Sequence, residues 1–165
     1  MAVHGAEVSF EKIARESGVG SATVHRHFPT RQSLMYAVFH HRINGLCARA
    51  AELAHEKDHG RALLTFLENV LDYCVDARGL AITLVLDNSE GGNGAEKSCS
   101  RELDEAAQPL VSKAIRAGAV RTDVTAAELL ALIVGIALST ESSRDPRGAA
   151  RRLLTLATVG LLPRD

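Results

Sequence analysis

The sequence predicts an all-α protein, in which a small N-terminal module precedes a larger helical body, with about eight helices in total. Apolar residues recur with the helical period along most of the 165 residues. No strand-like segment has a second one to pair with. Apolar side chains make up 46% of the chain, which is enough to build a core and argues against a disordered tail.

The first three expected helices form the module and the start of the body. A short helix begins near Ser9, a good N-cap residue, and ends by Gly18. A second short helix spans 21–27 and is stopped by the Phe-Pro pair that follows. Thr30 caps a long third helix, which we expect to end at the helix breaker Gly60.

The next segment is expected to hold two helices and a loop. A helix with one apolar stripe follows Gly60 and stops at 78–79. The apolar run 80–86 suits a strand or a buried helix, and we assign helix because no strand partner exists. Three glycines in 88–94 predict a flexible loop. The apolar stripe comprises Leu63, Leu67, Val70, Leu71 and Cys74.

Three further helices complete the body. One spans 98–117 and carries Pro109, which removes a backbone hydrogen bond and should kink it. Thr125 and Glu128 form a capping box that opens the next helix, which ends near 139. Asp145 then supplies an N-cap, and Pro146 a favoured first residue, for the last helix.

The last two helices indicate a partner subunit. The helix after Thr125 is apolar around most of its circumference, so every side of it must be covered. We expect a homodimer in which residues 125–162 of two copies meet as a four-helix bundle. The alternative is that both helices form the monomer's own core.

Charge is distributed unevenly along the chain. The formal net charge is −1, so bulk electrostatics do not indicate a nucleic-acid binder. Between Glu16 and Glu52, however, there is no acidic residue, while four arginines and four histidines lie there. This positive stretch suits a nucleic-acid surface, and its alternative is a solvated basic helix face.

The sequence predicts a cytoplasmic protein without a membrane span. The three cysteines are far apart and form no CxxC pair, which is typical of free thiols in a reducing compartment. Residues 1–7 lack the basic and apolar pattern of a secretory signal. The uncharged run 80–86 is too short to cross a bilayer.

One motif points to a function. Residues 9–34 read SFEKIARESGVGSATVHRHFPTRQSL, which places a short helix, a glycine turn, a second short helix and a third helix in succession. Gly18 permits the tight turn, and apolar residues hold the two short helices at a fixed angle. This is the layout of a helix-turn-helix module, whose second helix can enter the major groove of DNA.

The same residues resemble the N-terminal signature of the TetR family of transcriptional repressors. The matching positions, in order, are Ile13-Ala14, Gly18-Val19, Thr23, Arg26, His27-Phe28-Pro29, Arg31 and Leu34. Residues 118–123 and 160–161 match more loosely. The resemblance implies a regulator, acting as a repressor, that binds operator DNA as a homodimer and responds to a small-molecule effector.

By matching positions, the resemblance implies which residues touch DNA. The start of the second helix faces bases, where the methyl groups of Ala22 and Thr23 can pack on a thymine methyl. His25 stands where the family usually has an aromatic residue and can still donate to a phosphate. The alternatives are a structural role for His27 and a plain surface position for Arg31. The expected DNA-binding residues are Ser9, Ser21, Ala22, Thr23, His25, Arg26, His27, Thr30 and Arg31.

The start of the chain leaves a second reading open. The family has a full helix before the one at Ser9, but only eight residues precede Ser9 here. Either the natural protein starts further upstream or the module is incompletely covered. The alternative function is therefore a helical ligand-binding or protein-interaction dimer whose truncated module does not bind operators.

The resemblance divides the chain into a DNA-binding module, about 1–45, and an effector-binding and dimerisation body, about 46–165. The effector pocket should lie among the helices of residues 60–140. Apolar or amphipathic residues expected to face inward are its candidate lining, with ordinary core packing as the alternative. They are Phe66, Val70, Tyr73, Leu84, Leu103 and Leu110. No cofactor is expected.

An enzyme is the least favoured reading. The string 55–59, HEKDH, satisfies the H-E-x-x-H pattern of zinc proteases, which needs both histidines on one helical face. Gly60 follows at once, and no later histidine could serve as a third ligand. We therefore expect no metal site, no catalytic set and no enzymatic activity.

Overall fold

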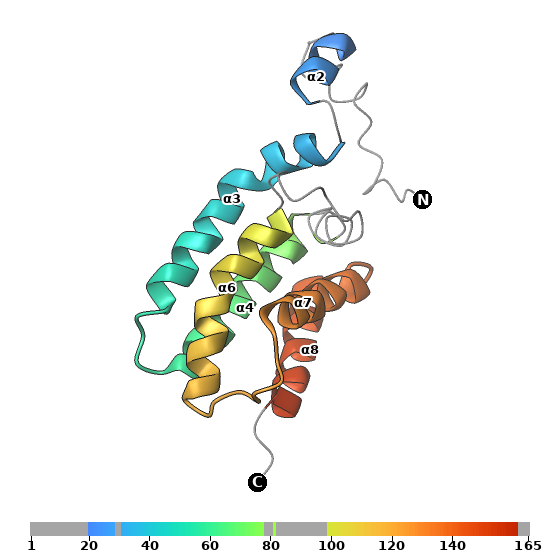
Figure 1. Cartoon of the computed structure of the whole chain (residues 1–165). Helices are drawn as coiled ribbons and strands as arrows, with labels where there is room; N and C mark the ends of the chain where they lie inside the picture. Colours follow the sequence, from blue (N-terminus) through green and yellow to red (C-terminus); the bar gives the residue numbers. More distant parts are fainter. Residues whose placement is uncertain (1–19, 29–30, 78–80, 82–98, 162–165) are drawn as a thin grey trace.

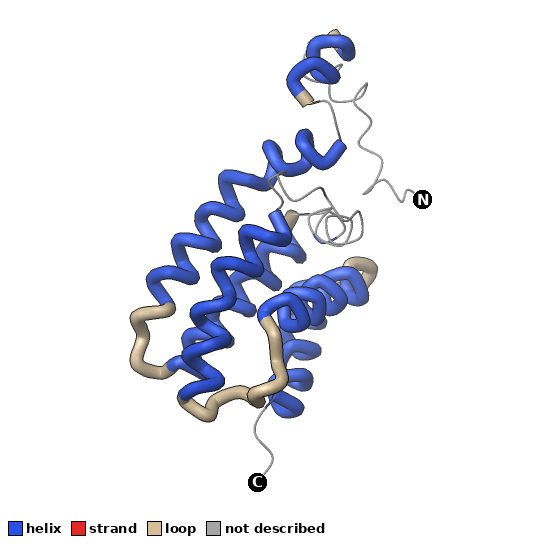
Figure 2. Tube along the Cα trace, viewed as in Figure 1, coloured by secondary structure: helices blue, strands red, loops and turns tan. Residues whose placement is uncertain are grey.

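The computed structural model describes residues 20–28, 31–77, 81 and 99–161, and these residues form helices and loops without a strand (Figure 2). The predicted all-α class is confirmed. The predicted count of about eight is not matched, since the described residues hold six helices. The helix expected from Ser9, most of the run 80–86 and the loop 88–94 lie outside the described residues. The helices are α2 (Ser21–His27), α3 (Arg31–Leu53), α4 (His59–Asp76), α6 (Cys99–Arg116), α7 (Ala126–Thr140) and α8 (Pro146–Leu161).

The body is built around α4. This helix packs against α3, α6, α7 and α8, while α3 also lies along α6 and α7 packs on α8 (Figure 1). Phe66, Val70 and Leu71 of α4 are fully buried at the centre of one continuous core. The predicted apolar stripe of this helix is buried throughout. The short α2 lies beyond the N-terminal end of α3, away from the other helices.

The boundary between α3 and α4 differs from the predicted one. The long helix ends at Leu53, not at Gly60, and successive turns follow it. Asp58 then caps α4, since its Oδ1 accepts a 2.9 Å hydrogen bond from the Arg61 amide. Gly60 lies in the first turn of α4, where an added Cβ would come within 2.9 Å of the Ala119 Cβ. The glycine is therefore explained by close packing and not by helix breaking.

The starts of α7 and α8 agree with the predicted caps. The Thr125 hydroxyl accepts from the Glu128 amide at 3.2 Å, and the Glu128 carboxylate accepts from the Thr125 amide at 2.9 Å. Asp145 Oδ1 accepts from the Gly148 amide at 3.0 Å at the start of α8. These caps satisfy amide donors that have no partner within the helix.

Pro109 lies exposed within α6, and the helix continues through it to Arg116.

No described helix is long and apolar enough to cross a membrane.

Candidate DNA-binding module and effector site

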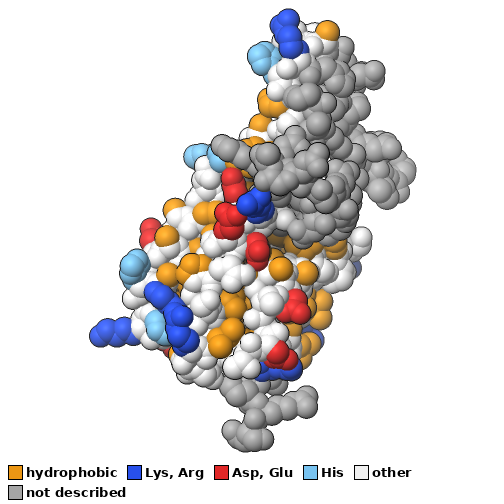
Figure 3. Space-filling model, in the orientation of Figure 1, with side chains coloured by type: hydrophobic (Ala, Val, Ile, Leu, Met, Phe, Trp, Pro, Cys, Tyr) orange, Lys and Arg blue, Asp and Glu red, His pale blue; other side chains and the backbone are white. Residues whose placement is uncertain are grey.

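The helix α2 begins directly after Gly20, whose carbonyl accepts a 2.9 Å hydrogen bond from the Thr23 amide. Its bounds are those predicted from the sequence, between the glycine turn and the Phe-Pro pair. Arginine and histidine side chains lie at the surface of this end of the molecule (Figure 3).

The predicted DNA-binding residues fall into three groups. Ala22, Arg26 and His27 are exposed on α2, and Thr23 is half-buried. Ser21 and His25 lie in α2 and Arg31 begins α3, but their side chains lie outside the described set. Ser9 and Thr30 lie outside the described residues altogether. The described side chains leave one surface of α2 accessible, as a groove-reading helix requires.

Most predicted effector-lining residues belong to the core. Phe66, Val70, Leu103 and Leu110 are buried among other apolar side chains. Leu84 lies outside the described residues. Of the predicted set, Tyr73 is the residue that also lines a groove in the described part of the chain.

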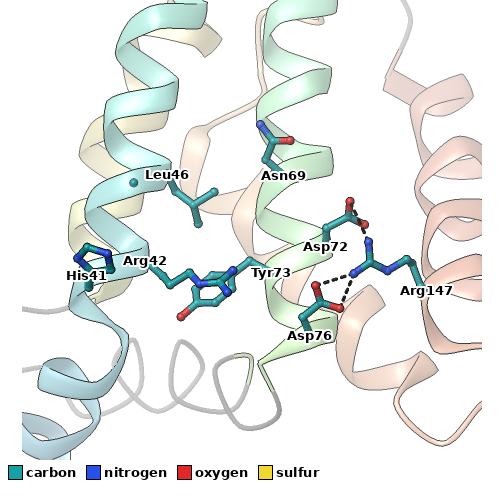
Figure 4. Close-up of a pocket in the computed structure, with 9 residues that line it drawn as sticks. His41, Arg42, Leu46, Asn69, Asp72, Tyr73, Asp76 and Arg147 are labelled. Atoms are coloured by element: carbon teal, nitrogen blue, oxygen red, sulfur yellow. Dashed lines mark hydrogen bonds and ion pairs between the residues drawn. The ribbon is translucent and has the colours of Figure 1, made fainter.

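That groove has a volume of about 490 Å³ and is lined by residues of α3, α4 and α8 (Figure 4). The Arg42 guanidinium lies 5.3 Å from the centroid of the Tyr73 ring, within the range of a cation–π interaction. Burial raises the pKa of the Tyr73 hydroxyl, and the Arg42 charge opposes that rise. The lining residues are His41, Arg42, Gly45, Leu46, Asn69, Asp72, Tyr73, Asp76 and Arg147.

Ion pairs join α4 to α8 at one side of the groove. Arg147 donates to both carboxylate oxygens of Asp76 at 2.5 Å. Arg151 donates to the two oxygens of Asp72 at 3.2 and 2.6 Å. The Asp76 hydrogen bond and the charges of Asp76 and Asp72 raise the pKa of Arg147. All four side chains are at least partly exposed, so these pairs orient the helices more than they stabilise them.

A polar contact joins α3 to α6 near the module. The Tyr36 hydroxyl donates a 2.7 Å hydrogen bond to Glu102 Oε1. The Tyr36 ring also stacks on the His40 ring, with centroids 4.6 Å apart. His40 Nδ1 lies 3.8 Å from Glu102 Oε2, which is too far for a hydrogen bond. Burial, and secondarily the hydrogen bond to Glu102, raise the pKa of Tyr36 to about 12.

The H-E-x-x-H string does not form the helical face that a zinc site needs. His55 and Glu56 lie in the turns after α3, whereas His59 opens α4. Among the described residues, no group of three or more His, Cys, Asp or Glu side chains could hold a metal ion.

Apolar surface remains exposed on the last two helices. Within the described residues, the exposed large hydrophobic side chains are Leu138 of α7 and Leu153 and Leu156 of α8, at 37%, 39% and 66% exposure. Isolated exposed leucines are common, but all three of these lie on two helices that pack against each other. They lie within the segment that the sequence predicts to dimerise.

Two family models match the chain. Residues 1–38 match the model of bacterial regulatory proteins of the tetR family. Residues 58–163, more than half of the chain, match the C-terminal domain of SbtR-like transcriptional regulators. The chain belongs to the TetR family of transcriptional regulators. Its helix-turn-helix module and DNA binding follow from this membership.

Solved structures of TetR-family regulators align with nearly all of this chain. A TetR transcriptional regulator from Streptomyces coelicolor is 32% identical, with 99% of this chain and 94% of that one covered and a TM-score of 0.62. A TetR regulatory protein from Mycobacterium vanbaalenii is 29% identical over 98% and 87% of the two chains, with a TM-score of 0.52. A TetR-family regulator from Pectobacterium atrosepticum, 19% identical over 97% and 86%, shares the fold with a TM-score of 0.61. No curated protein matches the chain.

Sequence reasoning about this TetR-family chain missed the groove. It anticipated Tyr73 alone, as an amphipathic residue expected to face inward. Arg42 and Arg147 are exposed charged residues more than one hundred positions apart, and no local pattern links them. Only the packing of both α3 and α8 on α4 brings them to one place.

Proposed function

We propose that this TetR-family regulator represses transcription by binding operator DNA as a homodimer. The recognition helix is α2, whose first residues, Ser21, Ala22 and Thr23, read base edges in the major groove. His25, Arg26 and His27 contact bases or phosphates. Ser9, Thr30 and Arg31 grip the backbone beside it, where contacts position the protein without reading sequence. The observation that carries this proposal is the accessibility of Ala22, Arg26 and His27 on a helix that stands away from the body.

The dimer is assigned to α7 and α8. The exposed leucines of these helices supply an apolar surface, and two copies of the pair would cover it as a four-helix bundle. Such a dimer would present two copies of α2 to successive major grooves, about 34–36 Å apart. We propose a division by role into the module, about 1–45, and the body, about 46–165. The division is not a structural break, because α3 runs continuously across residue 45.

A small molecule is proposed to modulate DNA binding without being chemically changed. The groove of about 490 Å³ supports this role, since its volume falls within the range of ligand sites and it joins α3 to α4 and α8. A ligand that prefers one arrangement of α3 shifts the population of DNA-binding dimers. Because a repressor acts on the chromosome, we propose that the protein is cytoplasmic. We propose no enzymatic activity for it.

A gel-shift titration tests the proposal. The labelled DNA is a duplex from the region upstream of the protein's own gene, and the control is an unrelated duplex of equal length and base composition. Specific binding by a dimer supports the repressor, with the specific duplex bound at least a thousandfold more tightly, as is typical of operators. Equal, weak binding of both duplexes favours the alternative, a ligand-binding or protein-interaction dimer without operator recognition.

A further inference from the structure

Beside its apolar packing, the module-proximal half of α3 makes a polar contact with the body through Glu102. Glu102 lies in the first turn of α6 and faces Tyr36 and His40, which are one helical turn apart on α3. One carboxylate oxygen is used: Oε1 accepts the Tyr36 hydroxyl at 2.7 Å. The other is not, since Oε2 is buried and has no hydrogen-bond partner.

The unused oxygen faces an equally unused nitrogen. His40 Nδ1 is buried without a partner, and it lies 3.8 Å from Glu102 Oε2. A hydrogen bond between a ring nitrogen and a carboxylate spans about 2.8 Å, so the pair is open by roughly 1 Å. The Tyr36 ring, stacked on the imidazole, holds it in this orientation. Glu102 therefore makes its hydrogen bond to Tyr36 but not one to His40.

We propose that Glu102 is a positioning residue for DNA binding, which holds α3 through Tyr36 and closes a second contact, to His40, when the imidazole carries a proton. Closure draws the N-terminal half of α3 toward α6. The module moves with it, because α2 ends only a few residues before α3 begins. Glu102 acts on DNA through α3 and does not itself touch the operator.

The other groups around this contact keep their protonation states over the pH range in which a histidine gains or loses a proton. Tyr36, with its pKa raised to about 12, remains a donor at every working pH. Burial raises the pKa of Cys47, which donates its thiol hydrogen to the Glu102 carbonyl oxygen, so this group stays neutral. Asn44, one turn along α3, places its amide 3.0 Å from His40 Nε2 and can donate to or accept from the ring after a flip. Histidine ordinarily titrates between pH 5 and 8.

Neighbouring charges do not replace Glu102 as the partner of His40. Glu105 lies one turn along α6 and is paired with Arg101 on the surface. Cys99, also near Tyr36, is buried in α6. His41 is adjacent to His40 but exposed on the groove side of α3. Among the described residues, Glu102 is the carboxylate within ion-pair distance of the His40 ring.

Hydrogen exchange tests the contact without DNA. The full-length protein is compared at pH 8 and pH 6, with intrinsic exchange rates corrected for pH, and the readout is amide protection over residues 31–43. The wild type should gain at least threefold protection at pH 6. Glu102→Gln should keep the Tyr36 acceptor and stay folded, but show no gain, and His40→Gln should behave in the same way. Glu105→Gln and His41→Gln are matched controls that should keep the gain.

Operator binding tests the positioning role, and this second measurement rests on the proposed function. At constant salt, the ratio of Kd at pH 8 to Kd at pH 6 is measured with the upstream duplex. His25 and His27 are unchanged in both proteins, so the contribution of Glu102 appears as a difference of at least threefold in this ratio between wild type and Glu102→Gln. Exchange protection that does not change with pH refutes the contact, and so does a gain in protection at pH 6 that persists in Glu102→Gln. A normal gain in protection with equal Kd ratios refutes the positioning role. Absence of all specific DNA binding overturns the proposed function, while the exchange result still decides the contact.

Discussion

Gly60 and Ala119 approach so closely that a methyl group on Gly60 would lie 2.9 Å from the Ala119 Cβ, nearer than two such carbons can pack. This relationship joins the first turn of α4 to the loop between α6 and α7. It makes glycine necessary at a helical position where alanine would otherwise be favoured by its helix propensity.

Gly60→Ala should therefore destabilise the protein, by about 1–3 kcal/mol, because the added methyl group overpacks the contact. Gly45→Ala is the matched control, since a Cβ there meets nothing within 4 Å and should stabilise α3 by about 0.5–1 kcal/mol. Urea unfolding of both variants measures the two changes. A stabilised Gly60→Ala protein would show that the loop carrying Ala119 yields freely.

Local chemistry was enough to predict some elements from the sequence and not others. The bounds of α2 and the cap at Thr125 follow from neighbouring residues, namely a glycine turn, a Phe-Pro pair and a Thr/Glu spacing. The predicted end of α3 is wrong because a glycine at position 60 has the local signature of a helix breaker. Its reason lies in Ala119, far along the chain, and the cap at Asp58 already starts the next helix.

The candidate sites divide in the same way. The module could be predicted because its recognition residues are contiguous, although their contacts with DNA remain a prediction. The groove could not, because Arg42, Tyr73 and Arg147 come from three helices. Apolar periodicity identified Phe66 and Leu103 as inward-facing, but it does not distinguish a core position from a ligand contact.

The capping box of α7 should make stability depend on acidic pH. The hydrogen bonds from the Thr125 hydroxyl and amide lower the pKa of Glu128. A carboxyl whose pKa is lower in the folded state stabilises the protein above its usual pKa, about 4.5, and loses that contribution as the pH falls through the lowered value. Wild type should thus unfold at higher urea than Glu128→Gln at pH 7, with the gap closing between pH 5 and 3.

Glu141→Gln serves as the control for that measurement, since Glu141 lies at the C-terminal end of the same helix. A negative charge there opposes the helix dipole, so its removal should not weaken the protein at pH 7. A pH-independent gap between wild type and Glu128→Gln would contradict the assigned role of the carboxylate.

The cysteines should differ in reactivity. Burial raises the pKa of the Cys74 thiol to about 12, and Cys99 is fully buried, so neither forms an accessible thiolate in the folded protein. Cys47 is partly exposed. With a chromogenic disulfide reagent at pH 8, native Cys47→Ser should react very slowly, whereas the same variant in denaturant should release two equivalents at once. Rapid reaction of the native variant would mean that the core around Cys74 or Cys99 opens readily.

Leu156 should be a principal contact of the proposed dimer, because it is the most exposed large hydrophobic side chain among the described residues. Leu156→Glu places a charge on the proposed apolar interface and should shift the protein to monomers in light scattering at micromolar concentration. Gln108→Glu adds a charge to the exposed face of α6 and should leave the dimer intact. A dimeric Leu156→Glu protein would move the interface away from this face of α8.

Arg26 offers the most direct test of the DNA-binding surface, because its side chain is exposed on α2 and a phosphate contact would change the salt dependence of binding by a known amount. Each phosphate neutralised by a cationic side chain steepens the dependence of log K on log salt by about 0.9. If Arg26 meets a phosphate, Arg26→Ala should flatten the slope by about that amount for operator and unrelated duplexes alike. If it reads a base, the variant should instead lose about 1–3 kcal/mol on the operator only.

Arg49→Ala is the control, since Arg49 lies near the opposite end of α3 and pairs with Glu52. Unchanged affinity and slope in Arg26→Ala would remove this residue from the interface, whereas equal losses in both arginine variants would point to nonspecific electrostatics.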